Sequence, residues 1–348
     1  MPAGRLVPKD KMPLQKTILS LFCGCGGLDL GFENAGYKTG LAYDRRPDAV
    51  SSWNRNRSTK VAREFDVQKL SLERLDEHYG SEFKPVGVIG GPPCQGFSLA
   101  NRNGSEHDPR NRLVKDFFAI ALELDERSPL DFIVMENVPS IEGSRGGGIL
   151  AEISEKLRDR GFAVRQRVLD AANFGVAQHR RRLFLFAVKK QAGLEPDWQS
   201  PIESEGIRTV RDEIGSLPAP LFFHRGNSAG PKPWHENHWC MTPKSTKFFD
   251  GTLHEGYTDR RSFKTLWWDK PSYTVSYGNR EVHVHPSATR RLSVYEGMLL
   301  QGFPHEFVLN GTMSSQITQV SEAVPPPLAF AVADSLRRTL ELPYSAAA

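Results

Sequence analysis

A thiol and a carboxyl group follow two short apolar runs of the chain and are suited to chemistry on one ligand. Cys94, in the sequence GGPPCQGFS, comes after the run 86–89, and Glu136 comes directly after the run 132–135. If the two runs are neighbouring strands, the thiol can attack an electron-poor carbon while the carboxylic acid supplies a proton or a hydrogen bond. Taken alone, Cys94 fits a buried, inert cysteine equally well.

Two arginines approach the same place from a further strand. Arg180 and Arg182 alternate through the sequence QHRRRLF, which leads into the apolar run 183–188, so their side chains share one face. Guanidinium groups in this position suit a base carbonyl and a phosphate. A basic strand at the surface is the alternative that the arginines leave open by themselves.

Glycines and acidic residues near the start of the chain describe a nucleoside pocket without a phosphate site. The turn 22–28 (FCGCGGL) follows the run 17–22 and permits close approach of the backbone to a ligand. It lacks the last glycine of a dinucleotide fingerprint, because Asp29 stands there, and no Lys-Ser/Thr follows. Asp44 and Asp66 end further runs, where carboxylates suit ribose hydroxyls and an adenine amino group, although single carboxylates are also common caps and turns.

The scaffold that must position these residues is an α/β domain. Five runs are apolar on both faces, at 17–22, 39–43, 86–89, 132–135 and 183–188. Segments with helical spacing, such as 113–124, lie between them. This alternation predicts an α/β domain with a mixed, mostly parallel sheet and flanking helices. In such sheets the ligand crevice lies at the carboxyl ends of the strands.

Changes in texture along the chain predict its domain organisation. We expect a flexible tail at 1–16, a catalytic and cofactor-binding domain at 17–189, and a smaller loop-rich domain at 190–276, where Pro, Gly, Trp and His rise and periodicity fades. Regular patterning returns in 277–348, which we expect to form a hinge and to return to the catalytic domain. There the prolines at 325–327 suit the start of a helix.

Composition limits the compartment and the partners. The chain has 348 residues, a formal net charge of +4 and four cysteines, too few for a disulfide framework. Without an apolar run of roughly 20 residues or a signal peptide, we expect a cytoplasmic protein with no membrane partner. Positions 158–190 carry nine Lys and Arg against two Asp, which suggests a polyanion partner or, alternatively, a solvated charged face.

Three residues have the spacing of a zinc half-site. His235, His238 and Cys240 lie within the sequence HENHWC, but no fourth ligand is evident. A structural zinc ion is almost always held by four ligands. We therefore interpret these residues as part of an irregular loop and expect no metal.

The order of these motifs resembles the cytosine-5 DNA methyltransferase family, of the kind found in bacterial restriction-modification systems. The resemblance covers residues 17–340. Its motifs are FxGxGG at 22–27, the acidic residues 44 and 66, GPPCQGFS at 91–98, ENV at 136–138, QxRxR at 178–182, RxL through QGFP at 290–304, and AVPP at 323–326. The ordered set is far more specific than any one motif.

The resemblance implies the Rossmann-like fold of S-adenosylmethionine-dependent methyltransferases. It also implies S-adenosylmethionine as the methyl donor, with S-adenosylhomocysteine as the product. The implied donor-binding residues are Phe22, Gly24, Gly26, Gly27, Leu28, Asp44, Arg45, Asp66, Val67, Pro92, Leu113, Glu322 and Ala323. The implied catalytic residues are Cys94, Glu136, Arg180 and Arg182. The thiolate of Cys94 would add to carbon 6 of a cytosine, and Glu136 would stabilise the charge that develops on the ring.

The family also implies duplex DNA as the partner, with the target cytosine flipped out of the stack. The expected DNA-binding residues are Gln95, Ser98, Arg102, Arg110, Asn137, Gln178, Thr274 and Arg290. The polar loop 99–110 suits a closing loop, and 190–276 would read base edges as a target-recognition domain. We further expect a monomer, activity associated with the nucleoid, and a cognate restriction endonuclease as a functional rather than physical partner.

Two motifs depart from the usual family pattern. Ser321 and Glu322 stand where the family usually has glycine and asparagine. Asp44 stands where glutamate is common, and Arg45 where a large aromatic residue often follows. Two other interpretations therefore remain beside an active DNA methyltransferase. One is a catalytically weak DNA-binding or regulatory homologue, and the other is a tRNA cytosine-5 methyltransferase with the same catalytic set.

Overall fold

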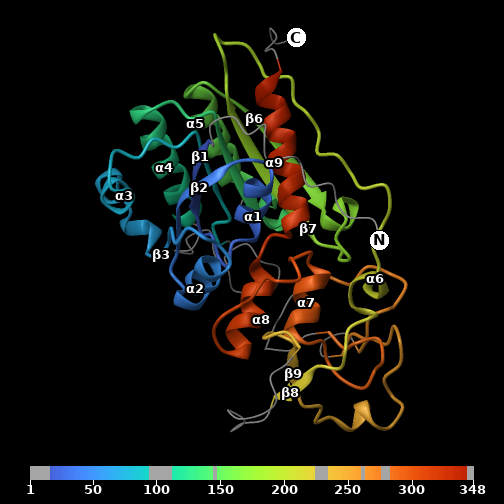
Figure 1. The fold of residues 1–348 in the computed structure, drawn as a ribbon. Coiled ribbons are helices and arrows are strands. Elements are labelled where there is room, and N and C mark those ends of the chain that lie inside the picture. The colour runs from blue at the N-terminus through green and yellow to red at the C-terminus, as the bar shows by residue number, and fades with distance from the viewer. Residues whose placement is uncertain are drawn as a thin grey trace.

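The computed structural model describes residues 16–93, 112–143, 147–223, 234–259, 263–275 and 283–342. Within these ranges a seven-stranded sheet forms the centre of the molecule, in the order β3-β2-β1-β4-β5-β7-β6 (Figure 1). Its strands are β1 (Thr17–Leu21), β2 (Lys38–Asp44), β3 (Ala62–Glu64), β4 (Gly87–Gly90), β5 (Phe132–Asn137), β6 (Phe162–Asp170) and β7 (Arg181–Lys189). No helix of the described ranges is long and apolar enough to cross a membrane.

The direction of the strands explains why the predicted site residues lie at one edge of the sheet. Strands β1 to β5 pair in parallel along the sheet, whereas β7 is antiparallel to both β5 and β6. The carboxyl ends of the parallel strands therefore meet the amino end of β7. In the register of β5 and β7, Asn137 lies opposite Leu183, so the arginines that enter β7 reach the edge where Glu136 lies. The expected mixed, mostly parallel sheet is confirmed.

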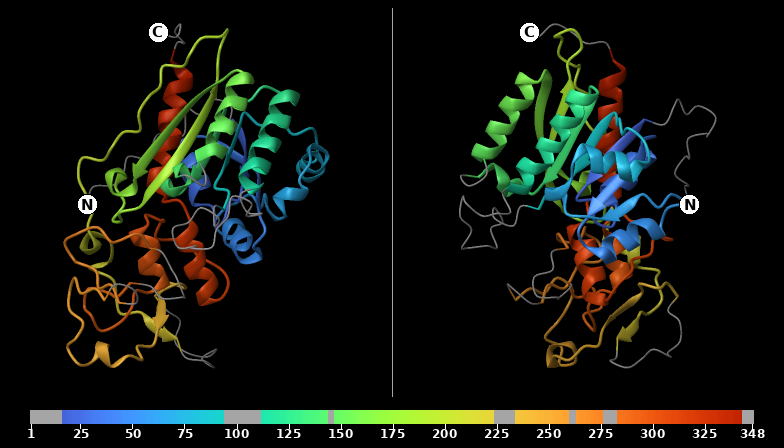
Figure 2. Two further views of the ribbon diagram at one scale, coloured as in Figure 1. Left: turned by 180° about the vertical axis from the view of Figure 1, so that it is seen from behind. Right: turned by 90° about the vertical axis from the view of Figure 1, so that its left-hand side faces the viewer.

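Helices cover both faces of the sheet and enclose two large apolar cores (Figure 2). One face carries α3 (Leu72–Tyr79), α4 (Arg112–Arg127) and α5 (Gly147–Asp159). The other carries α1 (Gly27–Asn34) and α9 (Pro326–Glu341), which lie side by side. A Cβ on Gly31 would lie 2.3 Å from Cβ of Ala329, so glycine is required where the two helices touch.

A third core lies below the sheet in Figure 1, around α7 (Val294–Leu300) and α8 (Met313–Glu322). Ser293 and Glu296 form a capping box that starts α7, and the Thr312 side chain caps α8. Shorter elements lie between β7 and α7 in the chain. They are α6 (Val210–Ile214), β8 (Leu221–Phe223), β9 (Trp239–Met241) and the 3₁₀ turn η6 (Thr246–Phe248), with long irregular connections.

The five strands expected from apolar runs are present as β1, β2, β4, β5 and β7, and the helix expected at 113–124 is α4. Strand β6 was not expected, because its sequence FAVRQRVLD lacks a continuous apolar run. It is an edge strand, and its middle residues are partly or fully exposed. The proposed domain boundaries stay a prediction.

Candidate active site

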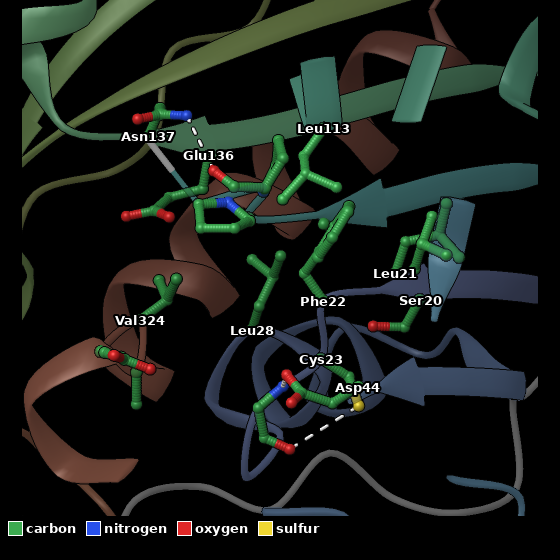
Figure 3. A pocket seen from close by; sticks show the side chains of 18 of the residues that line it. Ser20, Leu21, Phe22, Cys23, Leu28, Asp44, Leu113, Glu136, Asn137 and Val324 are labelled. Atoms are coloured by element: carbon green, nitrogen blue, oxygen red, sulfur yellow. Dashed lines mark hydrogen bonds between the residues drawn. The ribbon is translucent and has the colours of Figure 1, made fainter. Parts of the chain in front are cut away.

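A pocket of about 730 Å³ opens at the carboxyl edge of the sheet. Residues after β1, β2, β3, β4 and β5 line it, together with Arg180, Arg182 and the end of α8. Figure 3 shows Glu136 and Asn137 together at one side of this pocket and Cys23 and Asp44 together at another. Every residue predicted for the donor lines the pocket except Gly26.

The glycine-rich turn forms one wall of the pocket because its backbone takes conformations that favour glycine. Gly24 and Gly26 have φ angles of 54° and 90°, in the left-handed region. Gly27 is needed for a different reason, since a Cβ there would lie 2.2 Å from the carbonyl oxygen of Val324. The turn thus brings residues from both ends of the chain into contact.

On the side of this turn away from the pocket, Gly26 contacts the side chains of Trp53 and Arg57, which are both buried. Arg57 donates a hydrogen bond of 3.0 Å to the Gly26 carbonyl, and its guanidinium lies 4.0 Å from the centre of the Trp53 ring. The Trp53 indole donates to Asp29 at 3.0 Å. Burial raises the pKa of Asp29 to about 6. These contacts hold the turn in shape from outside the pocket.

Asp44 is a buried carboxylate at the end of β2, and three donors hold it. The Gly24 amide donates to Oδ2 at 2.9 Å, and the Arg46 amide and Nε donate to Oδ1 at 2.9 Å and 3.3 Å. Arg45 also lines the pocket. Arg46, which the sequence did not single out, is the residue that contacts Asp44.

Asp66 follows β3 and has two roles in the geometry. Its side chain accepts a hydrogen bond of 3.1 Å from the Gln68 amide and so caps the 3₁₀ turn η2 (Val67–Lys69). It also lines the pocket beside Phe65 and Val67. Asp66 is therefore a cap residue, as is common for single carboxylates, and it also lines the pocket.

Glu136 and Arg182 form an ion pair of 2.9 Å inside the pocket. The side chains are 10% and 12% exposed. Burial raises the pKa of the Glu136 carboxyl, and the positive charges of Arg182 and Arg180 oppose that rise. A buried carboxyl next to fixed cations is suited to hold or donate a proton to a polar ring atom.

The loop after β4 passes close to Glu136. A Cβ on Gly91 would lie 2.9 Å from Oε2 of Glu136, so glycine keeps room for the carboxyl. The Asn137 side chain donates a hydrogen bond of 3.1 Å to the Pro92 carbonyl. Asn137, which the sequence predicts to contact DNA, is 3% exposed and braces the backbone two residues before Cys94.

Arg180 lies deeper than Arg182 and is 1% exposed. Its backbone amide donates to Asp170 at 2.8 Å, and its Nη2 donates to the Ser321 carbonyl at 2.7 Å. Arg180 therefore joins the start of β7 to the end of α8 as well as lining the pocket. Arg182 is the arginine that contacts Glu136.

Five predicted residues lie outside the described ranges. These are Cys94, Gln95, Ser98, Arg102 and Arg110. The loop expected to close, 99–110, lies outside them as well. Pro93, the residue that precedes Cys94 in the chain, lines the pocket.

Two residues that were predicted to contact DNA have side-chain partners within the chain. Gln178 is fully buried, where its side chain accepts from the Val275 amide at 3.2 Å and lies 3.4 Å from Gln301. Arg290 makes a two-pronged ion pair with Glu296, at 2.8 Å and 2.7 Å. Both side chains join segments of the chain, and their contact with DNA stays a prediction. Thr274, by contrast, is partly exposed and donates to the His179 carbonyl.

The histidines near the zinc-like spacing have ordinary structural partners. Both ring nitrogens of His238 have oxygen partners, the Ser293 hydroxyl at 3.0 Å and the Pro218 carbonyl at 2.7 Å. His235 stacks on Tyr295, with ring centres 4.0 Å apart. Burial raises the pKa of Cys240 to about 12, so its thiol stays protonated. The spacing thus reflects packing around α7.

Some of the basic residues of 158–190 line the pocket, and others pair with carboxylates elsewhere. Arg180 and Arg182 face the pocket, whereas Lys189 pairs with Asp125 at 2.6 Å and Lys190 pairs with Glu195 at 2.5 Å. These carboxylates thus neutralise part of the local excess of charge. Only the structure reveals this, because nothing in the sequence marks them as partners.

Comparisons with known proteins agree with this geometry. The family model described as C-5 cytosine-specific DNA methylase matches residues 16–338. The chain is 34% identical over 329 residues to the type II methyltransferase M1.HphI of Haemophilus parahaemolyticus, covering 92% of this chain and 86% of the relative. It is 31% identical over 350 residues to M.MthTI of Methanothermobacter thermautotrophicus, covering 94% and 99%.

Solved structures show the same fold. A putative DNA modification methyltransferase encoded within an Escherichia coli prophage superposes with a TM-score of 0.78 at 24% identity, covering 94% of this chain and 99% of that one. The Dnmt2 methyltransferase of S. pombe superposes with a TM-score of 0.65 at 18% identity, covering 94% and 99%.

Proposed function

Because the chain belongs to the C-5 cytosine-specific DNA methylase family, we propose that its pocket binds S-adenosylmethionine beside a cytosine flipped out of duplex DNA. The observation that carries the proposal is that the Glu136–Arg182 pair and the glycine-rich turn line one pocket. The wall formed by the glycine-rich turn suits the nucleoside part of the donor. The wall that carries Glu136 and Arg182 suits the cytosine ring.

The residues of the pocket fit the donor. A volume of about 730 Å³ lies in the range of small-molecule sites. The left-handed glycines let the main chain approach a ligand closely, Asp44 offers a carboxylate to ribose hydroxyls, and Asp66 offers one to an adenine amino group. Phe22, Leu28 and Val324 add apolar surface. When bound, S-adenosylmethionine supplies the methyl group.

Glu136 and Arg182 are placed to activate the base. A cytosine ring is a poor electrophile until its ring nitrogen 3 is protonated or hydrogen-bonded. The buried Glu136 carboxyl, whose pKa is raised, is suited to hold a proton at that nitrogen and to accept from the exocyclic amine. Arg182 keeps the carboxyl oriented and balances its charge when it is ionised.

Cys94 is the proposed nucleophile. Its thiolate forms a bond to carbon 6 of the ring, which moves an electron pair toward carbon 5. Once carbon 5 carries the methyl group, carbon 5 loses its proton. The electron pair of that C–H bond then re-forms the double bond between carbons 5 and 6. The bond between sulfur and carbon 6 then breaks, and the thiolate leaves.

We further propose that 190–276 reads the DNA sequence and that contacts to phosphates offset the few kcal/mol needed to unstack the cytosine. A restriction endonuclease with the same target site would be the functional partner. The relatives named as type II methyltransferases support this interpretation.

The proposal is tested with a labelled methyl donor and two nucleic acids, duplex DNA and tRNA. We expect label in duplex DNA at carbon 5 of cytosine, which bisulfite sequencing locates. The Cys94→Ala variant should lose transfer while retaining DNA binding. Label in tRNA alone would assign the RNA substrate instead, and full activity of Cys94→Ala would refute the covalent route.

A further inference from the structure

The donor pocket is built from two ends of the chain, and one ion pair joins them. Arg46 follows β2, and Glu322 is the last residue of α8. Nη1 of Arg46 lies 2.5 Å from Oε2 of Glu322, while Nε of the same guanidinium donates to Asp44. Arg46 and Glu322 both line the pocket. A single guanidinium therefore connects both walls.

The surroundings of Arg46 hold it in this bridging position. Its side chain is 33% exposed, and Nη2 would lie 3.7 Å from a Cβ on Gly24, so the guanidinium lies against the glycine-rich turn. Burial lowers the pKa of Arg46, but the negative charges of Asp44 and Glu322 more than compensate and raise it. The group stays charged and is shared between two carboxylates.

The same contacts set the direction of the Asp44 carboxylate. A carboxylate has about four acceptor positions, and the Gly24 amide, the Arg46 amide and the Arg46 Nε use three of them. Two of these donors contact Oδ1, so the remaining capacity is on Oδ2. A carboxylate fixed in this way does not have to be ordered when a ribose hydroxyl binds to it.

We propose that Arg46 and Glu322 form a latch at the donor pocket, in which Glu322 acts as a positioning residue through Arg46. The latch holds residues 321–324 against the glycine-rich turn and keeps Asp44 oriented toward the donor ribose. This inference rests on the proposed function, because it concerns the affinity of the same pocket for the donor. Under this proposal, the role of Glu322 is to position Arg46.

The test measures binding of S-adenosylhomocysteine by calorimetry to the full chain and to Glu322→Gln, Arg46→Gln and the double variant. We expect Glu322→Gln to weaken binding by about twofold to fivefold, the size of a partly exposed ion pair. The double variant should bind no more weakly than Arg46→Gln. Glu341→Gln, which removes an exposed carboxylate paired with Arg337 on α9, is the matched control and should leave binding unchanged.

The dependence of binding on salt concentration distinguishes an ion-pair latch from a general structural effect of the Glu322→Gln substitution. At 1 M salt the screening length is about 3 Å, so the difference between the wild-type protein and Glu322→Gln should shrink toward none. A salt-independent difference, additive losses in the double variant, or unchanged binding by Glu322→Gln would each overturn the latch. Failure of the wild-type protein itself to bind would instead refute the proposed donor site.

Discussion

Glu136 and Arg182 lie 2.9 Å apart inside the pocket, although one ends a parallel strand and the other belongs to the antiparallel strand beside it. Because β5 and β7 run in opposite directions, the carboxyl end of one meets the amino end of the other. This antiparallel pairing places an acid and a cation side by side in one pocket. It is the geometric basis of the predictions about catalysis.

Replacing Glu136 by glutamine should lower kcat by about two to four orders of magnitude. Glutamine keeps the shape of the side chain but cannot supply a proton to the ring nitrogen. Release of the proton from carbon 5 of labelled cytosine measures the rate. Binding of S-adenosylhomocysteine should stay within about twofold, since Glu136 is proposed to face the base. A parallel loss of donor binding would contradict the separation of the two roles.

Replacing Gly27 by alanine should disrupt the donor pocket. The new Cβ would lie 2.2 Å from the Val324 carbonyl oxygen, so the backbone must move. We expect a loss of about 1–3 kcal/mol in the free energy of unfolding and at least tenfold weaker binding of S-adenosylhomocysteine. Gly148→Ala is the matched control, because a Cβ there meets no atom within 4 Å. Equal behaviour of the two variants would show that the close approach is unimportant.

Replacing Asp29 by asparagine should change how stability depends on pH. Burial raises the pKa of Asp29 to about 6, so the folded state binds this proton more tightly than the unfolded chain does. Its contribution is thus present below the unfolded pKa of about 4 and is lost as the pH rises to about 6. Relative to the wild-type protein, Asp29→Asn should gain up to about 3 kcal/mol between pH 4 and pH 7.

Urea unfolding at several pH values measures this difference. Asp159→Asn, at an exposed position of α5, controls for loss of a carboxylate. A constant difference between Asp29→Asn and the wild-type protein across this range would show that Asp29 titrates equally in both states.

Replacing Arg290 by glutamine tests its structural role. Arg290 binds both carboxylate oxygens of Glu296, whose side chain is 1% exposed. Removing one partner of a buried pair leaves an uncompensated charge, so unfolding should become easier by about 3–5 kcal/mol. Arg337→Gln, in an exposed pair on α9, should cost less than about 1 kcal/mol. If Arg290→Gln left stability unchanged but weakened DNA binding, the result would support the predicted contact of Arg290 with DNA instead.

Many of the residues that line the pocket were recognisable because their sequence signals are local. Apolar runs ending in Asp44 or Glu136 indicate buried strands, and the residues at the carboxyl ends of parallel strands lie at one edge of a sheet. The glycine-rich turn was recognisable for the same reason, since left-handed backbone favours one residue type. These patterns predicted the fold class and the composition of the pocket.

The sequence by itself therefore determined the kind of sheet, its reactive edge and the residue types collected there. Only the tertiary structure decided that Arg46 joins Asp44 to Glu322, that β6 forms an edge of the sheet, and that Arg290 pairs with Glu296. These features depend on contacts between segments of the chain, or on which face of an edge strand is solvated. Neither local periodicity nor spacing carries that information, because it arises only when the segments pack.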